Sequence, residues 1–325
     1  MDATLTGNQA ASAMAAARKP TGRLSDPLFV GVLWTSGIFV LILLGLIIAM
    51  LFEGGLPALQ EFGISFLWST TWNPVTEKFG AGVMVFGTIF SAVIAVVIAL
   101  PLSFGIAFFL TEIAPGPLRR PIGVAIQLLA AIPSIIYGMW GFFVIVPLMA
   151  AYVQPPLIEL LGPLPVIGAL FQGPPLGAGM LTAGLIMAIM ILPFITAMFV
   201  EVLESVPPMI KESAYGVGAT TYEVYRNVSV PYGRTAMVGA VMLGLGRALG
   251  ETMAVTFVIG NATRMSASLF APGSTIASTI ANEFPEAGPG SLKLQSLLEL
   301  GFILFVISFI VLALSRLLVR SKLKG

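Results

Sequence analysis

Two oppositely charged side chains, Arg247 and Glu251, lie inside an apolar stretch of the sequence that reads GAVMLGLGRALGETMAVTFVIG. A charge at the centre of a bilayer costs ~2.5 to 3.5 kcal/mol on the insertion scale, so charges at such positions point to a function. The two residues are four positions apart and would share one face of a helix, where they can neutralise each other. A structural ion pair is the simpler interpretation. However, two buried charges stabilise a helix bundle poorly, because desolvation can exceed their attraction.

The chemistry of this pair suits the binding of an oxyanion. A guanidinium is always protonated, and its planar fork fits two adjacent oxygens. We expect Arg247 to present a positive charge to a transiting anion, and Glu251 to hold Arg247 when the path is empty and to accept the proton of a protonated oxyanion. Phosphate fits this description, whereas sulfate carries no donor at neutral pH and would meet repulsion from Glu251. Gly244, Gly246 and Gly250 permit close helix approach or local unwinding beside the pair, although plain packing explains them equally well.

Ser134 and Tyr137 form a second, weaker candidate set. Both follow Pro133, where a kink could turn their hydroxyls toward the same path. In the alternative interpretation, Ser134 caps backbone carbonyls freed by the proline and Tyr137 packs in the core.

The composition shows which kind of protein must position these residues. The chain has 325 residues, of which 57% are hydrophobic and 10% charged, so lipid is its natural solvent. Cysteine and histidine are absent, which removes disulfides, thiolate nucleophiles, histidine bases and Cys/His metal sites. No nucleophile and base can be assembled, so we expect no catalytic residues and no metal site. No basic run suits nucleic acid either.

Six apolar spans are each long enough to cross a membrane. They cover residues 28–52, 82–110, 122–150, 176–200, 235–260 and 294–318. With the N-terminus inside, twelve Lys and Arg residues fall on the cytoplasmic side, and Lys78, Arg264 and Lys293 fall outside. The inner twelve are Arg18, Lys19, Arg23, Arg119, Arg120, Lys211, Arg226, Arg234, Arg316, Arg320, Lys322 and Lys324. This excess predicts that both termini are cytoplasmic.

The predicted organisation follows from these spans. A polar cytoplasmic tail (1–27) precedes the first transmembrane helix (28–52) and a periplasmic loop (53–81), and a five-helix core (82–318) ends in a basic tail (319–325). The outer connection 151–175 is rich in proline and predicts turns with short interfacial pieces. The outer connection 261–293 is polar enough to lie against a partner, although a plain surface loop remains open. Its polar residues are Ser266, Ser268, Ser274, Thr275, Ser278 and Thr279.

The cytoplasmic segment 201–234, EVLESVPPMIKESAYGVGATTYEVYRNVSVPYGR, does not read as a plain loop. A helix is predicted to start near Pro207 and Pro208 and to stop at Gly216 or Gly218. Thr220 and Glu223 form a capping-box pattern that opens a second short helix, which Pro231 is expected to end. Three scattered basic residues on a membrane tether make a DNA-binding helix-turn-helix a poor alternative.

The same segment resembles the EAA loop of ABC-importer permeases. The match runs through Glu212-Ser213-Ala214, three residues, Gly218, nine residues and Val228-Ser229-Val230-Pro231, with Ser213 in place of alanine and valines in place of isoleucine and leucine. The alternative is an ordinary inner loop. The resemblance implies that the loop forms a coupling helix, which docks on an ATP-hydrolysing subunit. Because this chain holds no G-x-x-x-x-G-K-[ST] motif, that ATPase is expected to be a separate protein.

The stretch from Gly246 to Thr252, GRALGET, resembles the signature of phosphate-specific ABC permeases. With its continuation Met253-Ala254-Val255 and the stretch 131–138 (AIPSIIYG), the chain is similar to the PstC-type subunits more than to the PstA-type subunits, from about Asp26 onward. The resemblance implies an all-α, type I importer fold in the bacterial inner membrane. It also implies a PstA-like second permease, two PstB-like subunits that use ATP and Mg²⁺, and a periplasmic PstS-like protein that delivers phosphate; this chain itself would bind no cofactor.

Two other readings remain open. An ABC permease for another oxyanion would keep the same architecture. An ion-coupled secondary transporter would use Arg247 and Glu251 as a proton relay, but it would have no use for the coupling segment.

Overall fold

The computed structural model describes residues 25–165 and 167–321, and within them the ordered elements are helical. Contacts divide the chain into two units, residues 1–50 and 51–325, which are described separately. Six helical stretches are long and apolar enough to span a membrane. These are Pro27–Leu67, Gly82–Ile113, Ser134–Leu161, Met180–Glu204, Thr221–Leu249 and Leu292–Leu314. Of the predicted tails 1–27 and 319–325, residues 1–24 and 322–325 lie outside the described residues.

The first helix, α2 (Ser25–Phe62), belongs to both units. The helix continues ten residues beyond the predicted end at Phe52, so the first part of the expected outer loop is helical, followed by the 3₁₀ turn η1 (Gly63–Leu67). Gly55 allows this second half to pack on α14 (Leu292–Ser321), because a Cβ there would lie 2.8 Å from the Cα of Glu299.

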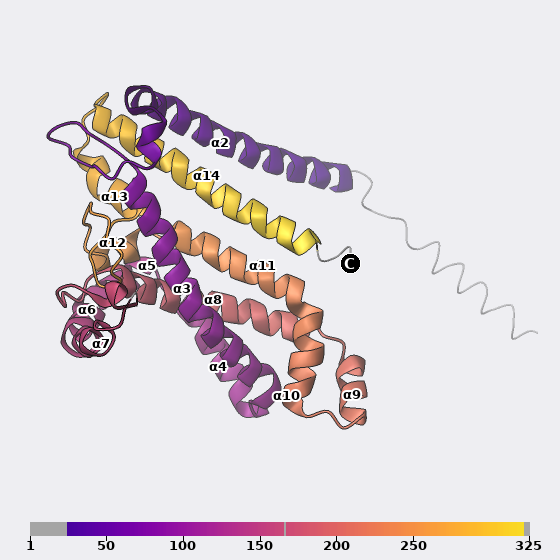
Figure 1. Cartoon of the computed structure of the whole chain (residues 1–325). Helices are drawn as coiled ribbons and strands as arrows, with labels where there is room; N and C mark the ends of the chain where they lie inside the picture. The colour runs from indigo at the N-terminus through magenta and orange to yellow at the C-terminus, as the bar shows by residue number, and fades with distance from the viewer. Residues whose placement is uncertain (1–24, 166, 322–325) are drawn as a thin grey trace, which may run out of the picture. The chain divides into compact units, whose positions relative to one another are not determined.

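The core of the second unit is built from α3 (Gly82–Phe108), α8 (Met180–Glu204) and α11 (Val230–Leu249), which pack side by side (Figure 1). Small residues at the contacts let the backbones approach closely, as is usual where lipid supplies no hydrophobic drive between helices. At Gly184 of α8, for example, a Cβ would lie 2.4 Å from the side chain of Ile94. The middle helix α8 is the most buried of the six spans, since 61% of the residues in its apolar stretch are buried.

The third predicted span, 122–150, is not one helix. Helix α4 (Gly116–Ala130) ends before Pro133, and a new helical stretch starts at Ser134. Pro133 lacks the amide hydrogen that a continuing helix needs, and its preceding residue is pushed out of helical geometry. The stretch after the break comprises α5 (Ser134–Trp140), η3 (Gly141–Ile145), α6 (Val146–Leu148), η4 (Met149–Val153) and α7 (Gln154–Leu161).

The fifth predicted span, 235–260, is wrong at both ends. Helix begins much earlier, at α10 (Thr221–Val224), and passes through the π-turn η6 (Tyr225–Ser229) into α11 without interruption. Pro231 therefore does not end the helix. Proline has no amide hydrogen to donate, and the wider hydrogen-bonding pattern of the π-turn before it accommodates that missing donor. At the far end α11 stops at Leu249, and α12 (Met253–Val258) follows after a break.

The connection 261–293 packs against its own chain, which buries most of the polar residues that the sequence offered for contact with a partner. Thr275 and Ser278 form a capping box at the start of α13 (Ile276–Glu283), which the 3₁₀ turn η7 (Phe284–Glu286) follows. Ser268, Ser274, Thr275, Ser278 and Thr279 are buried, and Ser266 is half-buried. The connection 151–175 holds α7 and the 3₁₀ turn η5 (Ile167–Phe171), as the expected short pieces.

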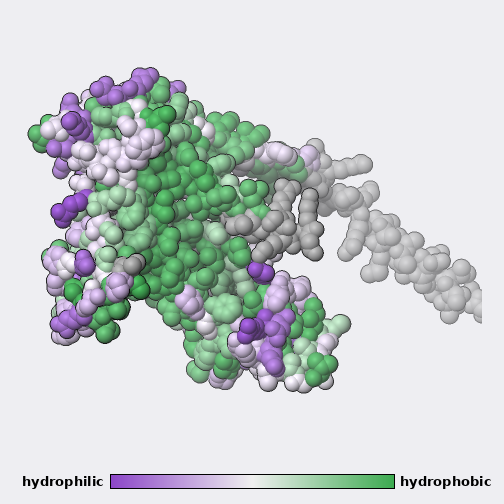
Figure 2. Space-filling model, in the orientation of Figure 1, coloured by the Kyte–Doolittle hydropathy of each residue, from purple (hydrophilic) through white to green (hydrophobic). Residues whose placement is uncertain are grey.

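The two ends of the second unit differ in what they carry. α9 (Pro208–Gly216), α10 and the start of α4 gather at one end, and α13 and the start of α14 lie at the other (Figure 1). On the face shown in Figure 2, an apolar surface separates hydrophilic patches at these two ends. This pattern is typical of a chain that crosses a bilayer.

Candidate functional site

The two broken spans meet close to their breaks. Helix α5 starts right after the break at Ala131–Pro133, and α12 starts right after the break at Gly250–Thr252. The two helices pack at Gly138, where a Cβ would lie 2.8 Å from the Cα of Ala254, so a larger residue would force them apart. Non-helical backbone at membrane depth is tolerated where it is buried in protein or lines a water-filled cavity. Two such breaks at one place therefore indicate a binding region.

Arg247 lies in the last turn of α11, immediately before the second break, and its side chain is exposed. Within residues 25–165 and 167–321, the ion pairs join Lys211 to Glu112 and Lys293 to Glu283 and Glu286, and none of them involves Arg247. The guanidinium is therefore available to another group.

Glu251 does not pair with Arg247, contrary to the prediction for the empty path. The two residues were expected to share one face of a continuous helix. That helix, α11, ends at Leu249, so the break at Gly250 separates Arg247 from Glu251. The Glu251 carboxylate instead accepts a hydrogen bond from the Ala254 amide through Oε1, at 3.1 Å, at the start of α12. It remains half-buried, so it adds a carboxylate beside the exposed arginine without neutralising it.

Tyr137 packs in the core, as the alternative interpretation expected, and it also makes the hydrogen bond to a backbone carbonyl that was expected of Ser134. Tyr137 is buried, and its hydroxyl donates at 2.9 Å to the Leu129 carbonyl in the last turn of α4, which also accepts a hydrogen bond from the Ile132 amide. Ser134, the first residue of α5, is half-buried. Tyr137 therefore joins the two halves of the broken third span.

Residues 201–234, called the coupling segment after their expected role, have the predicted form at the turn between α9 and α10. Gly218 adopts φ +91°, which favours glycine, and the capping box between Thr220 and Glu223 is present. On α9, Glu212 and Ser213 are exposed and Ala214 is half-buried. Exposed apolar side chains surround them, with Met209 77% and Val217 87% exposed. This end of the chain thus carries an apolar surface rimmed by polar groups, which is typical of a protein-binding site.

An ion pair that the sequence did not reveal ties α9 to the transmembrane core. Lys211 Nζ lies 2.7 Å from Glu112 Oε1, and both side chains are largely shielded from solvent. Glu112 belongs to the π-turn η2 (Phe109–Ile113) at the end of α3. Arg119 of α4 donates to the carbonyls of Leu110 and Thr111 in the same turn. The turn η2 therefore connects the coupling segment to the start of α4.

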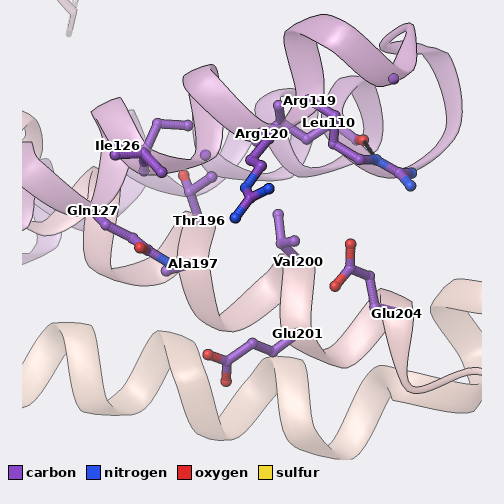
Figure 3. A pocket seen from close by; sticks show the side chains of 13 residues that line it. Leu110, Arg119, Arg120, Ile126, Gln127, Thr196, Ala197, Val200, Glu201 and Glu204 are labelled. Atoms are coloured by element: carbon purple, nitrogen blue, oxygen red, sulfur yellow. Dashed lines mark hydrogen bonds between the residues drawn. The ribbon is translucent and has the colours of Figure 1, made fainter.

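A pocket of about 380 Å³ opens between α4 and α8 beside this junction (Figure 3). Arg120 reaches from α4 toward α8, and Thr196 and Glu204 lie on the facing wall (Figure 3). Arg119 and Arg120 entered the sequence analysis only as inner charges, since nothing in the chain order pairs them with residues some eighty positions later.

Comparison with known proteins identifies the chain. The family model described as a binding-protein-dependent transport system inner membrane component matches residues 102–324. A protein of Mesorhizobium japonicum named phosphate transport system permease protein PstC is 57% identical over 293 residues, which cover 90% of this chain and 89% of that protein. The chain belongs to the PstC family of these membrane components.

Two further relatives carry the same name, and two solved structures share the fold. The PstC protein of Pasteurella multocida is 56% identical over 282 residues (87% of this chain, 88% of that one). The probable PstC protein of Methanocaldococcus jannaschii is 40% identical over 277 residues (84% and 86%). A bacterial alginate ABC transporter shares the fold with a TM-score of 0.60 at 15% identity (90% and 93% covered). The MetNI methionine ABC transporter gives 0.56 at 16% (73% and 94%).

The family and the fold together define the class of the protein. It is a multi-pass, all-α membrane protein with the fold of type I importer permeases, as predicted, and a non-catalytic subunit of an ABC transporter that contains other subunits. The individual site residues rest on the geometry described above.

Proposed function

We propose that the chain is the permease subunit of an ATP-driven importer of inorganic phosphate, and that Arg247 and Glu251 bind phosphate where the two spans break. The observation that carries the proposal is the exposed, unpaired Arg247 beside these breaks, in a family whose members are named for phosphate transport. A charge held at membrane depth without a partner stabilises nothing by itself, so a bound anion explains it better.

The hydrogen-bond acceptor of the site, the Glu251 carboxylate, distinguishes between oxyanions. Arg247 donates to two phosphate oxygens, while the Glu251 carboxylate accepts the hydrogen bond of a P–OH group. Sulfate lacks that hydrogen at neutral pH and meets a repulsive carboxylate. Tyr137 acts as a positioning residue that holds the end of α4 at the break, and Ser134 lies at the same break with an unassigned hydroxyl.

The coupling segment implies the partners. An ATPase, PstB-like and in two copies, would dock on α9 around Glu212, Ser213 and Ala214, with Gly218 setting the turn and Pro231 opening α11. That subunit would use ATP and Mg²⁺, and this chain would bind no cofactor. A PstA-like permease would complete the path, and a periplasmic PstS-like protein would deliver phosphate to it.

The orientation follows from the charges. With α9 and the basic loops inside, both termini are cytoplasmic and α13 lies at the periplasmic end. Cysteine scanning tests this directly, because the chain has no cysteine of its own. A cysteine at Val217 should react with a membrane-impermeant maleimide only after cell lysis, and one at Val75 should react in intact spheroplasts.

The decisive experiment replaces Arg247. Arg247→Gln should lower phosphate uptake by about tenfold to a hundredfold, since hydrogen bonds to a charged group contribute ~1.5 to 3 kcal/mol. Complex assembly, followed by co-purification of the ATPase, should stay normal. Arg316→Gln removes an exposed arginine elsewhere on the chain and serves as the control. Normal uptake by the Arg247→Gln complex would refute the role of this residue.

A further inference from the structure

The pocket between α4 and α8 repeats the chemistry of the site at the breaks. It holds about 380 Å³ and lies at the end of the second unit that carries α9 (Figures 1 and 3). Its polar lining residues are Arg119, Arg120, Gln127, Thr196, Glu201 and Glu204, and the side chain of Glu201 is turned away from Arg120 (Figure 3). Its size is ample for an inorganic oxyanion with some of its water.

Arg120 is the cationic group of this pocket. It extends from α4 toward α8 (Figure 3), and it takes part in none of the ion pairs of residues 25–165 and 167–321. Its neighbour Arg119 is different, because its guanidinium is occupied by the carbonyls of Leu110 and Thr111. Of the two adjacent arginines, one therefore fixes the start of α4 and the other is available to a ligand.

Thr196 supplies an independent sign that a polar ligand belongs here. It is 0% exposed on α8, and its hydroxyl has no hydrogen-bond partner. A buried hydroxyl without a partner costs about 1 to 3 kcal/mol. Most membrane threonines avoid this cost by bonding to the carbonyl one turn back, as Thr88 and Thr111 do in this chain. Since Thr196 lines the pocket, a ligand there would satisfy it.

We propose that this pocket is a second phosphate subsite, on the cytoplasmic side, which phosphate occupies as it leaves the path; the proposal rests on the function proposed above. Arg120 donates to the oxygens, Thr196 donates or accepts, and Glu204 accepts the P–OH hydrogen. The carboxylate decides between two sources of phosphate chemistry. Free hydrogen phosphate carries a P–OH group for Glu204, whereas a lipid phosphodiester carries none and is repelled.

The test uses the complete importer in proteoliposomes, with ATP in the lumen and the binding protein outside, so that the lumen corresponds to the cytoplasm. The initial rate of labelled phosphate uptake is measured against increasing unlabelled phosphate in the lumen. Luminal phosphate should slow the parent complex by occupying the exit pocket. Arg120→Gln should raise the inhibitory concentration by roughly tenfold, Thr196→Val should raise it by a few-fold, and the control Arg316→Gln should leave it unchanged.

Two further arms separate the possible ligands. Glu204→Gln should let luminal sulfate inhibit, which it should not do in the parent. Vesicles of phosphatidylcholine alone and vesicles containing phosphatidylglycerol should give the same inhibition curve. If the anionic lipid shifts that curve as Arg120→Gln does, the pocket binds lipid headgroups and the proposal fails.

Failure of this proposal is distinguishable from failure of the function. If the complexes take up phosphate but the parent, Arg120→Gln and Thr196→Val respond identically to luminal phosphate, the subsite is refuted and the proposed function stands. If the assembled parent complex takes up no phosphate, both are refuted.

Discussion

The ion pair between Lys211 and Glu112 should determine how efficiently ATP hydrolysis drives transport, because it is the charged link between α9 and the transmembrane core. The charges are 2.7 Å apart, with side-chain exposures of 19% and 9%. At an effective dielectric constant of ~20, their attraction is about 6 kcal/mol, most of which desolvation offsets. We expect about 1 to 3 kcal/mol of net coupling in a double-mutant cycle.

The perturbation is Lys211→Met, which keeps the length of the side chain and removes its charge. The unpaired Glu112 should loosen the contact between η2 and α9, and each phosphate imported should then require several-fold more ATP. The assay is the ratio of ATP hydrolysed to phosphate taken up in proteoliposomes. Exchange of the two charges, Lys211→Glu with Glu112→Lys, should restore the ratio at least in part.

Lys293→Met is the matched control, because it breaks a comparable ion pair, 3.1 Å from Glu283, at the opposite end of the second unit. It should leave the ratio unchanged. The reasoning is wrong if Lys211→Met assembles normally and keeps the parental ratio, or if Lys293→Met raises the ratio by the same factor.

Three further predictions concern single positions. Gly138→Ala should lower the free energy of unfolding of the complex by about 1 to 3 kcal/mol, because the added Cβ would overlap the backbone of α12. Gly105→Ala should leave it unchanged, because a Cβ at Gly105 meets nothing within 4 Å. Gly218→Ala should weaken ATPase binding by about 1 kcal/mol, as its φ is +91°, and the helical Gly216→Ala should be neutral by comparison in a co-purification assay. Tyr137→Phe removes the hydrogen bond from α5 to the Leu129 carbonyl at the end of α4, and it should reduce phosphate uptake several-fold without loss of assembly. Uptake at the parental level would contradict this.

The sequence predicted features whose signals are local. The apolar spans are long runs, so their number and approximate positions follow from hydropathy alone. The turn of the coupling segment was also predictable: the spacing of Thr220 and Glu223 defines a capping box, and both partners form it. The turn at Gly218 was predictable for the same reason. A glycine just after a helix and before the next N-cap is typical of a residue with positive φ, and Gly218 has φ +91°.

The breaks in the third and fifth spans could not be predicted with the same rules. Pro193 lies inside the continuous helix α8, whereas the helix ends before Pro133, so a proline in an apolar run does not by itself decide between a kink and a break. The hydrogen bond that crosses the break comes from the Tyr137 hydroxyl, on the far side of Pro133, to the Leu129 carbonyl, and the proline itself does not indicate it. Likewise, the carboxylate of Glu251 could be assigned to Arg247 or to a helix start only once the end of α11 was known.

We expect α4 to link α9 to the break beside Arg247, because both ends of this helix are bound to neighbouring elements. In the first turn of α4, Arg119 binds η2. The ion pair between Glu112 of η2 and Lys211 of α9 then joins η2 to α9. The last turn of α4 is bound through Tyr137 to α5 at the break beside Arg247. A helix of 15 residues spans about 22 Å, so it can carry a displacement of α9 to the level of the break without unwinding. Because Arg120 and the α4–α8 pocket lie along this helix, the same displacement would change the width of the pocket as it changes the site at the breaks. Spin labels on Ser213 and Gln127 should therefore keep their separation when the ATPase binds ATP, while the distance from Gln127 to a label on α8 changes. A large change in the first distance would show that α4 does not act as the link.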